Sequence, residues 1–293
     1  MPITLDFSGK LVLVTGGGRG IGAAISKALA KGGADIAITY TSVDASPYAA
    51  QLTSDHGITA KAFRCEVSSS AEVDGMLGEV EAAFGRKVDI GIANAGVSLW
   101  KDSHDNTDAD FQRLFDVNVS GPFYLSRALV RSWLSLPIAV GSTSSSLDIT
   151  SLRGDKAVNL GKQILFVSSI SGLVAMTPQR QAAYNASKGA VTMLSKSLAA
   201  EWAHIGVMVN SVSPGYVLTD MIANPPDATA STWVSDWQAR TPAGRFATPD
   251  EVGEFVALLV SEKQGGMGWM TGSDVVIDGG EWGAGEETRP HAS

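Results

Sequence analysis

The sequence predicts an α/β fold in which one parallel sheet is covered by helices on both faces. Short apolar runs alternate along the chain with longer segments whose apolar residues recur at helical spacing. The runs are almost continuously apolar, which is typical of strands buried on both faces. Neither an internal repeat nor a break in composition divides the chain, so residues 1–281 are expected to form a single domain, followed by a tail at 282–293.

Seven runs are the candidate strands. They are residues 11–15 (LVLVT), 35–40 (DIAITY), 61–67 (KAFRCEV), 89–96 (DIGIANAG), 163–169 (QILFVSS), 207–215 (VMVNSVSPG) and 274–280 (DVVIDGG). The first segment between them has Ile21, Ala24, Ile25, Ala28 and Leu29 at spacings of three and four, which predicts a helix directly after the first strand.

Three segments depart from this alternation. Residues 138–161 are rich in Ser and Thr without a clear period, which indicates a surface insertion before the fifth strand. Residues 220–245 place Trp233 and Trp237 in a loop-and-helix pattern and are interpreted as a substrate lid, although aromatic residues there could equally serve a subunit interface. Residues 282–293 are interpreted as a loose C-terminal tail.

Composition and charge exclude several classes of protein. Of the 293 residues, 44% are hydrophobic and 18% are charged, which fits a large buried core and not a disordered chain. The net charge is −8 and no run of Lys or Arg occurs, which argues against nucleic acid and membranes as partners. The N-terminus lacks the features of a signal peptide, so a cytoplasmic location is expected. The lone Cys65 is interpreted as a core thiol.

A glycine-rich turn, TGGGRGIG (15–22), joins the first strand to the first helix. Gly16, Gly20 and Gly22 allow a tight turn and let the backbone approach a pyrophosphate at the helix N-terminus. Glycines also serve ordinary strand–helix packing, but the position between a strand and a helix favours dinucleotide binding.

The end of the second strand indicates which dinucleotide is bound. An acidic residue there would hold the adenosine ribose and repel a 2′-phosphate. The sequence instead has Thr41 and Ser42, while Asp44 comes too late unless the loop curls back. Arg19 in the glycine turn could face a 2′-phosphate, or could be an ordinary surface charge. We therefore expect NADP(H) in preference to NAD(H).

Tyr184 and Lys188 lie four residues apart in a segment with helical periodicity, on one helix face. A nearby ammonium favours the phenolate and lowers a tyrosine pKa, which suits acid–base chemistry. Ser169 closes the fifth strand, at the sheet edge where ligands bind in open parallel sheets. Taken alone, Ser169 could be a strand-end cap, Asn118 a turn residue, and Tyr184 with Lys188 an exposed helical pair.

Together, these motifs resemble the short-chain dehydrogenase/reductase family over about residues 7–281. The matching motifs, in order, are Thr15-Gly16…Gly20-Ile21-Gly22, Asn94-Ala95-Gly96, Asn118 in DVNVSG, Ser169, Tyr184-x-x-x-Lys188, Pro214-Gly215 and Asp278-Gly279-Gly280. The fifteen residues from Ser169 to Tyr184 are two more than in many members. This spacing is similar to that of fungal mannitol dehydrogenases and sorbose or xylulose reductases.

The resemblance implies a Rossmann-like single domain with a seven-stranded parallel sheet. It also implies a catalytic tetrad of Asn118, Ser169, Tyr184 and Lys188. In it, Ser169 orients the substrate oxygen, Tyr184 exchanges the proton, Lys188 binds the nicotinamide ribose, and Asn118 holds a water that connects Lys188 to solvent. It further implies a homotetramer or homodimer.

The expected cofactor-binding residues combine the glycine turn, the cofactor-discriminating loop and the family positions. They are Gly16, Gly18, Arg19, Gly20, Ile21, Gly22, Thr41, Ser42, Glu66, Val67, Asn94, Ala95, Gly96, Tyr184, Lys188, Pro214, Gly215, Val217 and Thr219. Glu66 stands where the family more often has an aspartate that contacts adenine. Thr219 would hold a cofactor phosphate or carboxamide, and Val217 would pack near the nicotinamide.

The expected activity is NADP(H)-dependent hydride transfer between a ketone and a secondary alcohol, on a ketose or polyol or on a secondary-metabolite ketone. Reduction of C=C or C=N bonds at the same cofactor site is an alternative. A non-enzymatic nucleotide-sensing scaffold is another, but it predicts loss of the tetrad, and all four residues are present. The four histidines show no metal-ligand spacing, so no metal is expected.

Overall fold

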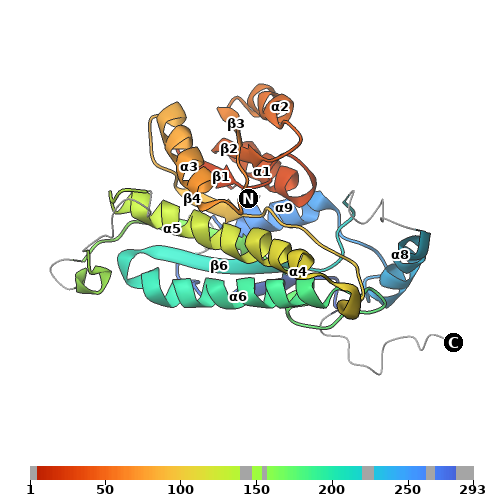
Figure 1. Cartoon of the computed structure of the whole chain (residues 1–293). Helices are drawn as coiled ribbons and strands as arrows, with labels where there is room; N and C mark the ends of the chain where they lie inside the picture. Colours follow the sequence, from red (N-terminus) through yellow and green to blue (C-terminus); the bar gives the residue numbers. More distant parts are fainter. Residues whose placement is uncertain (1–4, 139–146, 154–156, 220–227, 262–267, 282–293) are drawn as a thin grey trace.

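A seven-stranded, all-parallel sheet forms the centre of the molecule (Figure 1). The computed structural model describes residues 5–138, 147–153, 157–219, 228–261 and 268–281. The strands are β1 Leu11–Val14, β2 Asp35–Tyr40, β3 Ala60–Arg64, β4 Ile90–Ala93, β5 Lys162–Val167, β6 Val207–Pro214 and β7 Asp274–Ile277. All seven predicted strands are confirmed. Most end one to three residues early, because the residues that follow leave the sheet to form loops at its carboxyl edge.

The strand order is β3-β2-β1-β4-β5-β6-β7. The chain therefore builds outward from β1 to β3 and then returns to place β4 on the other side of β1. This reversal leaves a crevice beyond the carboxyl ends of β1 and β4, the position at which open α/β sheets bind ligands.

Helices cover both faces of the sheet. One face carries α1 Gly20–Lys31, α2 Ser46–His56 and α9 Pro249–Leu259, and the other carries α3 Ser70–Phe84, α5 Gly121–Trp133 and α6 Ala182–Trp202. Within β1, Leu11 and Leu13 pack into one core while Val12 and Val14 pack into the other. Burial on both faces explains why the strands read as continuous apolar runs.

Two further helices extend the site end of the sheet. The helix α4 Asp108–Phe115 contacts α6, and α8 Ala228–Arg240 lies at one end of the molecule, beyond the carboxyl end of β6 (Figure 1). No helix in the described part of the chain is both long enough and apolar enough to cross a membrane.

The predicted insertion at 138–161 lies far from the carboxyl edge of the sheet. In its described part, the backbone N–H of Leu160 donates to the Ile205 carbonyl (2.9 Å), and His204 Nε2 lies 2.8 Å from the Ile149 carbonyl. These contacts fasten it at the entrance to β5. Residues 139–146 and 154–156 of this segment, residues 220–227 of the predicted lid and the predicted tail at 282–293 lie outside the described residues.

Candidate active site

A cavity of about 820 Å³ opens in the crevice beyond β1, β2 and β4. It brings together most of the predicted cofactor-binding residues. These are Gly16, Gly18, Arg19, Gly20, Ile21, Gly22, Thr41, Ser42, Glu66, Val67, Asn94, Ala95, Gly96, Tyr184, Lys188 and Thr219. They come from six separate stretches of the chain.

The glycine turn is shaped by close backbone contacts. A Cβ on Gly22 would lie 2.3 Å from the Gly16 carbonyl oxygen, so only glycine fits where α1 meets the turn. Gly16 itself has a φ of +63°, in the left-handed region. The first turn of α1 has no capping side chain and no acidic residue. Its N-terminal N–H groups therefore suit an anion such as a pyrophosphate.

The Asn94-Ala95-Gly96 motif ties β4 to β1. The Asn94 amide donates to the Thr15 carbonyl (2.9 Å), and the backbone N–H groups of Asn94 and Ala95 both lie 3.0 Å from Thr15 Oγ1. Asn94 thus fixes the floor of the cavity that it also lines.

The loop after β2 curls back toward the cavity, which brings Asp44 into the lining beside Thr41 and Ser42. The Asp44 carboxylate accepts hydrogen bonds from the Ser46 hydroxyl (2.7 Å) and backbone N–H (2.9 Å), which lower its pKa. Arg19 is exposed at the same cavity. This loop therefore presents one acidic group to a bound nucleotide and the glycine turn presents one basic group, with the acidic group already engaged by Ser46.

A buried thiol, Cys65, and a carboxylate, Glu66, follow the end of β3. Cys65 is fully buried, and burial raises its pKa to about 12, which confirms the prediction of a core thiol. Glu66 lines the cavity and accepts a hydrogen bond from the Ser68 hydroxyl (2.9 Å).

A second, smaller cavity of about 120 Å³ adjoins the first. Ile21, Tyr184 and Thr219 line both cavities, so the two meet at the Tyr184 side chain. The predicted residues Ser169, Gly215 and Val217 line only the smaller one.

Tyr184 and Lys188 both project from α6 toward this junction. Lys188 is buried; its Nζ donates to the Val167 carbonyl (2.9 Å) and lies 5.7 Å from the centroid of the Tyr184 ring. Burial lowers the pKa of Lys188 to about 8.

The pKa of Tyr184 moves in the direction opposite to the sequence-based prediction. Burial raises it, and a hydrogen bond with Ser169 lowers it by less. The prediction counted the attraction of a phenolate to Lys188 and to an oxidised nicotinamide, and it did not count the burial of the phenol. In this pocket, desolvation of the phenolate is the largest influence on the pKa of Tyr184.

The two adjacent serines have different roles. The Ser168 hydroxyl donates to the Lys188 carbonyl (3.1 Å) and lies 2.8 Å from Thr192 Oγ1, which fastens α6 to β5. Ser169 faces the smaller cavity, and its hydroxyl also accepts the Ser171 backbone N–H (3.1 Å). Ser168 lines the larger cavity and Ser169 the smaller one, and Ser169 as the residue that orients the substrate stays a prediction.

Asn118 lies behind the site in a π-helical turn, Asp116–Ser120, with a side chain only 1% exposed. Its amide oxygen accepts the Val97 N–H (2.9 Å), and its amide nitrogen donates to the Val97 carbonyl (2.9 Å) and to Ser187 Oγ (3.0 Å). These bonds use both amide protons and one lone pair of the amide oxygen. Asn118 lies outside both cavity linings, as does the buried Pro214.

Sequence reasoning missed several cavity residues. Arg113 of α4 lines the larger cavity, and no motif pointed to it. Tyr216 lines the smaller one. The segment PQRQ (178–181), whose extra length already indicates a loop beside the pocket, contributes Gln179 and Gln181 to the same lining. The position of Tyr216 directly after Pro214-Gly215 was a signal for the tyrosine.

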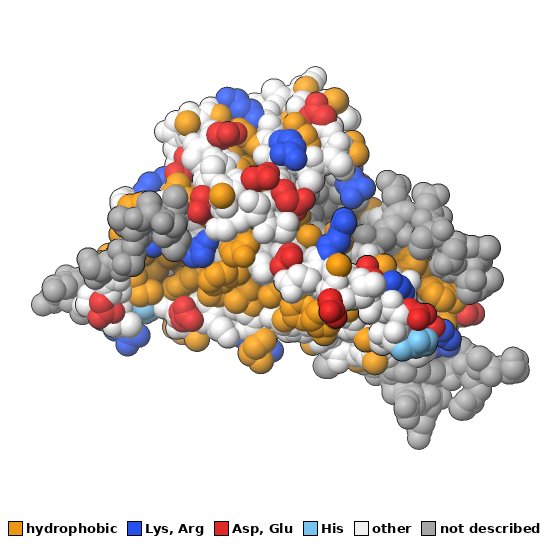
Figure 2. All heavy atoms as spheres, in the orientation of Figure 1, with side chains coloured by type: hydrophobic (Ala, Val, Ile, Leu, Met, Phe, Trp, Pro, Cys, Tyr) orange, Lys and Arg blue, Asp and Glu red, His pale blue; other side chains and the backbone are white. Residues whose placement is uncertain are grey.

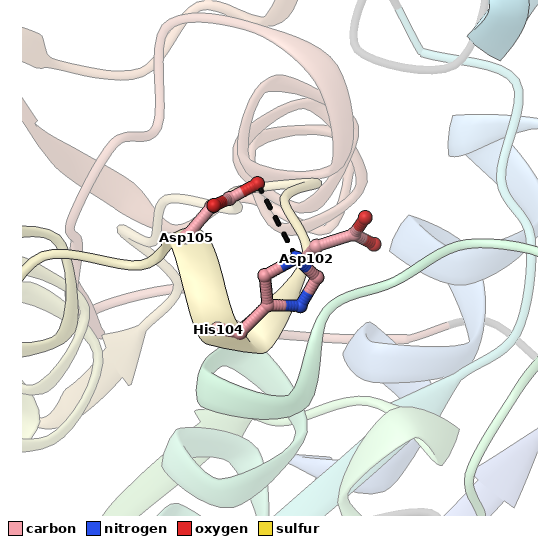
Figure 3. A group of neighbouring side chains, drawn as sticks. All are labelled: Asp102, His104 and Asp105. Atoms are coloured by element: carbon pink, nitrogen blue, oxygen red, sulfur yellow. Dashed lines mark ion pairs between the residues drawn. The ribbon is translucent and has the colours of Figure 1, made fainter.

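Asp102, His104 and Asp105 gather on a turn that begins two residues after the cavity residue Trp100 (Figure 3). His104 Nε2 lies 3.7 Å from an Asp105 oxygen, and both Asp102 oxygens accept hydrogen bonds of 2.7 Å from Arg180 Nη1. Because Arg180 already occupies the Asp102 carboxylate, the group is best described as a surface ion-pair cluster.

Comparison with protein families gives two matches that together span the domain. Residues 10–162 match the family described as short chain dehydrogenase, and residues 142–281 match one described as enoyl-(acyl carrier protein) reductase.

Individual relatives match almost the whole chain. A sorbose reductase of Candida albicans is 37% identical over 94% of this chain and 88% of its own length. An NADP-dependent mannitol dehydrogenase of Alternaria alternata is 33% identical over 94% of this chain and 93% of its own. The crystal structure of L-sorbose reductase from Gluconobacter frateurii, complexed with NADPH and L-sorbose, superposes with a TM-score of 0.77 at 26% identity, over 94% of this chain and 98% of that one.

Proposed function

We propose that this chain, which belongs to the short-chain dehydrogenase/reductase family and is an oxidoreductase, interconverts a ketose and its polyol. The proposed cofactor is NADP(H). The observation that carries the proposal is the junction of the two cavities at Tyr184, with Ser169 on one side and Lys188 on the other. The relatives that act on sorbose and mannitol, and the NADPH in the sorbose reductase structure, support the substrate class and the cofactor.

The larger cavity fits a dinucleotide. The uncapped N-terminus of α1 would bind the pyrophosphate, and the glycine turn lines the cavity beside it. Thr41, Ser42 and Arg19 would surround a 2′-phosphate, while Thr219 and Val217 would lie near the nicotinamide end. When bound, the cofactor supplies or accepts the hydride.

Tyr184 is the proposed proton donor to the alkoxide that forms as a ketone is reduced. Its raised pKa keeps the phenol protonated at neutral pH, which suits reduction. Ser169 would hold the carbonyl oxygen beside that phenol. Lys188 would bind the nicotinamide ribose. Because Val97 and Ser187 accept both Asn118 amide protons, a water at this position would bind the amide oxygen or the backbone of the π-helical turn.

The helix α8 belongs to the predicted lid at 220–245, and we propose that it closes the smaller cavity. Trp237 is fully buried and its ring centroid lies 5.4 Å from that of Trp100 and 5.0 Å from that of Tyr216. Trp233 lies 6.0 Å from Trp100. These contacts join α8 to the loops that follow β4 and β6, so the helix excludes water from the substrate side of Tyr184.

We also propose that the protein is a homodimer or homotetramer. Apolar side chains gather on the face formed by α4, α5 and α6 (Figure 2), where Phe111 is 47%, Phe123 36% and Met193 61% exposed. An exposed apolar patch of this kind is typical of association surfaces. Sedimentation equilibrium would measure the state, and a monomer at micromolar concentration would contradict the proposal.

Arg19→Ala tests the preference for NADP(H). We expect kcat/KM with NADPH to fall about tenfold or more, because a charged hydrogen bond to the 2′-phosphate is lost, while kcat/KM with NADH changes less than about twofold. Lys27→Ala is the matched control, since Lys27 lies on α1 but pairs with Asp250 (2.8 Å). Equal losses with both cofactors would show that Arg19 does not read the phosphate.

The activity itself is tested by oxidation of NADPH with a panel of ketones, with identification of the products. We expect turnover of ketoses such as sorbose. The family model described as enoyl-(acyl carrier protein) reductase favours a second candidate, reduction of C=C bonds. Turnover of an α,β-unsaturated thioester with no turnover of any ketone would favour that candidate over the ketose activity.

A further inference from the structure

The wall of the smaller cavity contains three polar side chains within an aromatic frame. Gln179 is 5% and Gln181 7% exposed, and Tyr216 lies beside them at the end of β6. The frame is formed by Trp237 and Trp100, which also line the cavity. Buried amides in such surroundings must be hydrogen-bonded, and their partners determine what they can offer to a ligand.

The hydrogen bonds of Gln179 have a direction fixed by chemistry. Trp237 Nε1–H can only donate, so the atom 2.7 Å from it must be the amide oxygen of Gln179. The amide nitrogen then faces Tyr216 and donates to its hydroxyl at 2.7 Å. The Tyr216 oxygen is therefore an acceptor in this bond, and its own proton points away from Gln179.

Tyr216 is held rigidly and stays protonated. Its ring stacks on Trp237 with an interplanar angle of 19°, and burial together with the charge of Glu281 raises its pKa. It therefore presents a neutral O–H of fixed orientation.

Gln181 repeats the arrangement on another part of the wall. Trp100 Nε1–H donates to its amide oxygen (3.1 Å), and its amide nitrogen donates to Ser171 Oγ (3.1 Å). An amide nitrogen carries two protons, so one remains beyond the bond to Ser171. The indole of Trp237 thus orients the Gln179 amide nitrogen toward the Tyr216 hydroxyl. The indole of Trp100 orients the Gln181 amide nitrogen toward the Ser171 hydroxyl.

From these contacts we propose that the Trp237–Gln179–Tyr216 chain is a specificity element that directs the Tyr216 O–H toward a hydroxyl oxygen of the substrate, next to the carbon that reacts at Tyr184. The inference rests on the proposed function and specifies the substrate as a hydroxylated ketone. A ketone without hydroxyls leaves this donor unpaired in a buried site, which disfavours its binding. Tyr216 acts as a binding residue, and Gln179 and Trp237 are positioning residues.

The sharpest test is Gln179→Glu. This substitution preserves the shape of the side chain and reverses the direction of its hydrogen bond with Tyr216. A carboxylate still accepts from Trp237, but it can only accept from Tyr216, so the Tyr216 proton turns toward residue 179 and is lost to the substrate. At pH 8, where the hydrogen bonds from Trp237 and Tyr216 favour the ionised carboxylate at residue 179, we expect the KM for sorbose to rise about tenfold in both Gln179→Glu and Tyr216→Phe. We expect kcat to change less than about threefold. We expect kcat/KM for 2-hexanone to stay the same or to rise, because neither variant leaves the Tyr216 donor unpaired beside this ketone.

Matched controls separate this effect from damage to the fold. Gln238→Glu makes the same charge change on α8, where Gln238 is exposed and contacts Gly244, and Tyr124→Phe removes a hydroxyl on α5. Neither should change the KM for sorbose. If Gln179→Glu and Tyr216→Phe lower kcat/KM for sorbose and for 2-hexanone equally, these hydrogen bonds only support the cavity wall and the proposal is wrong.

Direct binding separates this inference from the proposed function. If the wild type reduces neither ketone, the proposed ketone reduction fails, and calorimetric titration of sorbose into the NADPH complex decides the inference by itself. Binding about tenfold weaker in Tyr216→Phe than in the wild type supports the inference. Equal binding, or no binding to the wild type, overturns it.

Discussion

Tyr184→Phe is expected to lower kcat/KM for ketone reduction by about 10²- to 10⁴-fold, the range that general acid catalysis contributes. The phenylalanine ring fills the same space at the junction of the two cavities but cannot deliver a proton to the alkoxide. Binding of NADPH should change little, because the larger cavity keeps its glycine turn and Lys188. Steady-state kinetics and cofactor titration by fluorescence measure the two effects separately.

The direction of the Tyr184 pKa shift also predicts the pH dependence. Reduction needs the protonated phenol, so its rate should be level through neutral pH and fall only as pH rises through the pKa, which burial moves upward. Oxidation of the alcohol needs the phenolate, so its rate should rise over the same range. Tyr124→Phe serves as the control. Full activity in Tyr184→Phe, or a reductive rate that rises with pH, would show that another group transfers the proton.

The fold was predictable because its signals are local. Continuous apolar runs identify buried strands wherever they lie, and Val12 and Val14 facing one core with Leu11 and Leu13 facing the other show why. The ends of the strands were less predictable. Residues such as Asn94 continue an apolar run in sequence but leave the sheet to bond with Thr15, a contact 79 positions away.

Residues of the candidate site were predictable where the backbone conformation or a fixed spacing along a helix determines their position. Gly22 must be glycine because of the Gly16 carbonyl, and Tyr184 and Lys188 share a helix face. The direction of the Tyr184 pKa shift and the engagement of the Asn118 side chain were not predictable, because both depend on how tightly distant segments enclose a group. The same is true of Tyr216, whose orientation is set by Gln179 and Trp237 from two other segments.

Lys188→Met is expected to inactivate the enzyme and at the same time to stabilise the fold. The ammonium is buried with one hydrogen bond in the structure, to the Val167 carbonyl, and burial lowers its pKa from 10.5 to about 8. A lowering of this size corresponds to a penalty of about 3 kcal/mol on the charged form at neutral pH. Methionine has a similar length and no charge. Because the Val167 carbonyl loses its partner, we expect a net gain of about 1–2 kcal/mol in the free energy of unfolding.

The loss of activity follows from the same residue. Without the ammonium, the ribose of the nicotinamide loses its proposed partner and the phenolate of Tyr184 loses its nearest cation in the site, so kcat/KM should fall at least about 10³-fold. Lys196→Met is the matched control, because Lys196 lies on the same helix but is exposed. It should change neither activity nor stability by a measurable amount.

The stability difference between wild type and Lys188→Met should depend on pH in a defined direction. Below about pH 8 both the folded and the unfolded wild type carry a protonated Lys188, so the burial penalty is fully present. Between about pH 8 and 10.5 the unfolded state binds more protons, so the wild type gains stability relative to the variant as pH rises. Urea unfolding of the cofactor-free proteins at pH 7 and pH 9.5 should therefore show the advantage of Lys188→Met shrinking. An advantage that is constant with pH, or a variant less stable than wild type at pH 7, would show that Lys188 is not buried as a costly charge. In the structure the Lys188 ammonium is buried and its pKa is lowered, so this charge serves the proposed chemistry and lowers the stability of the fold.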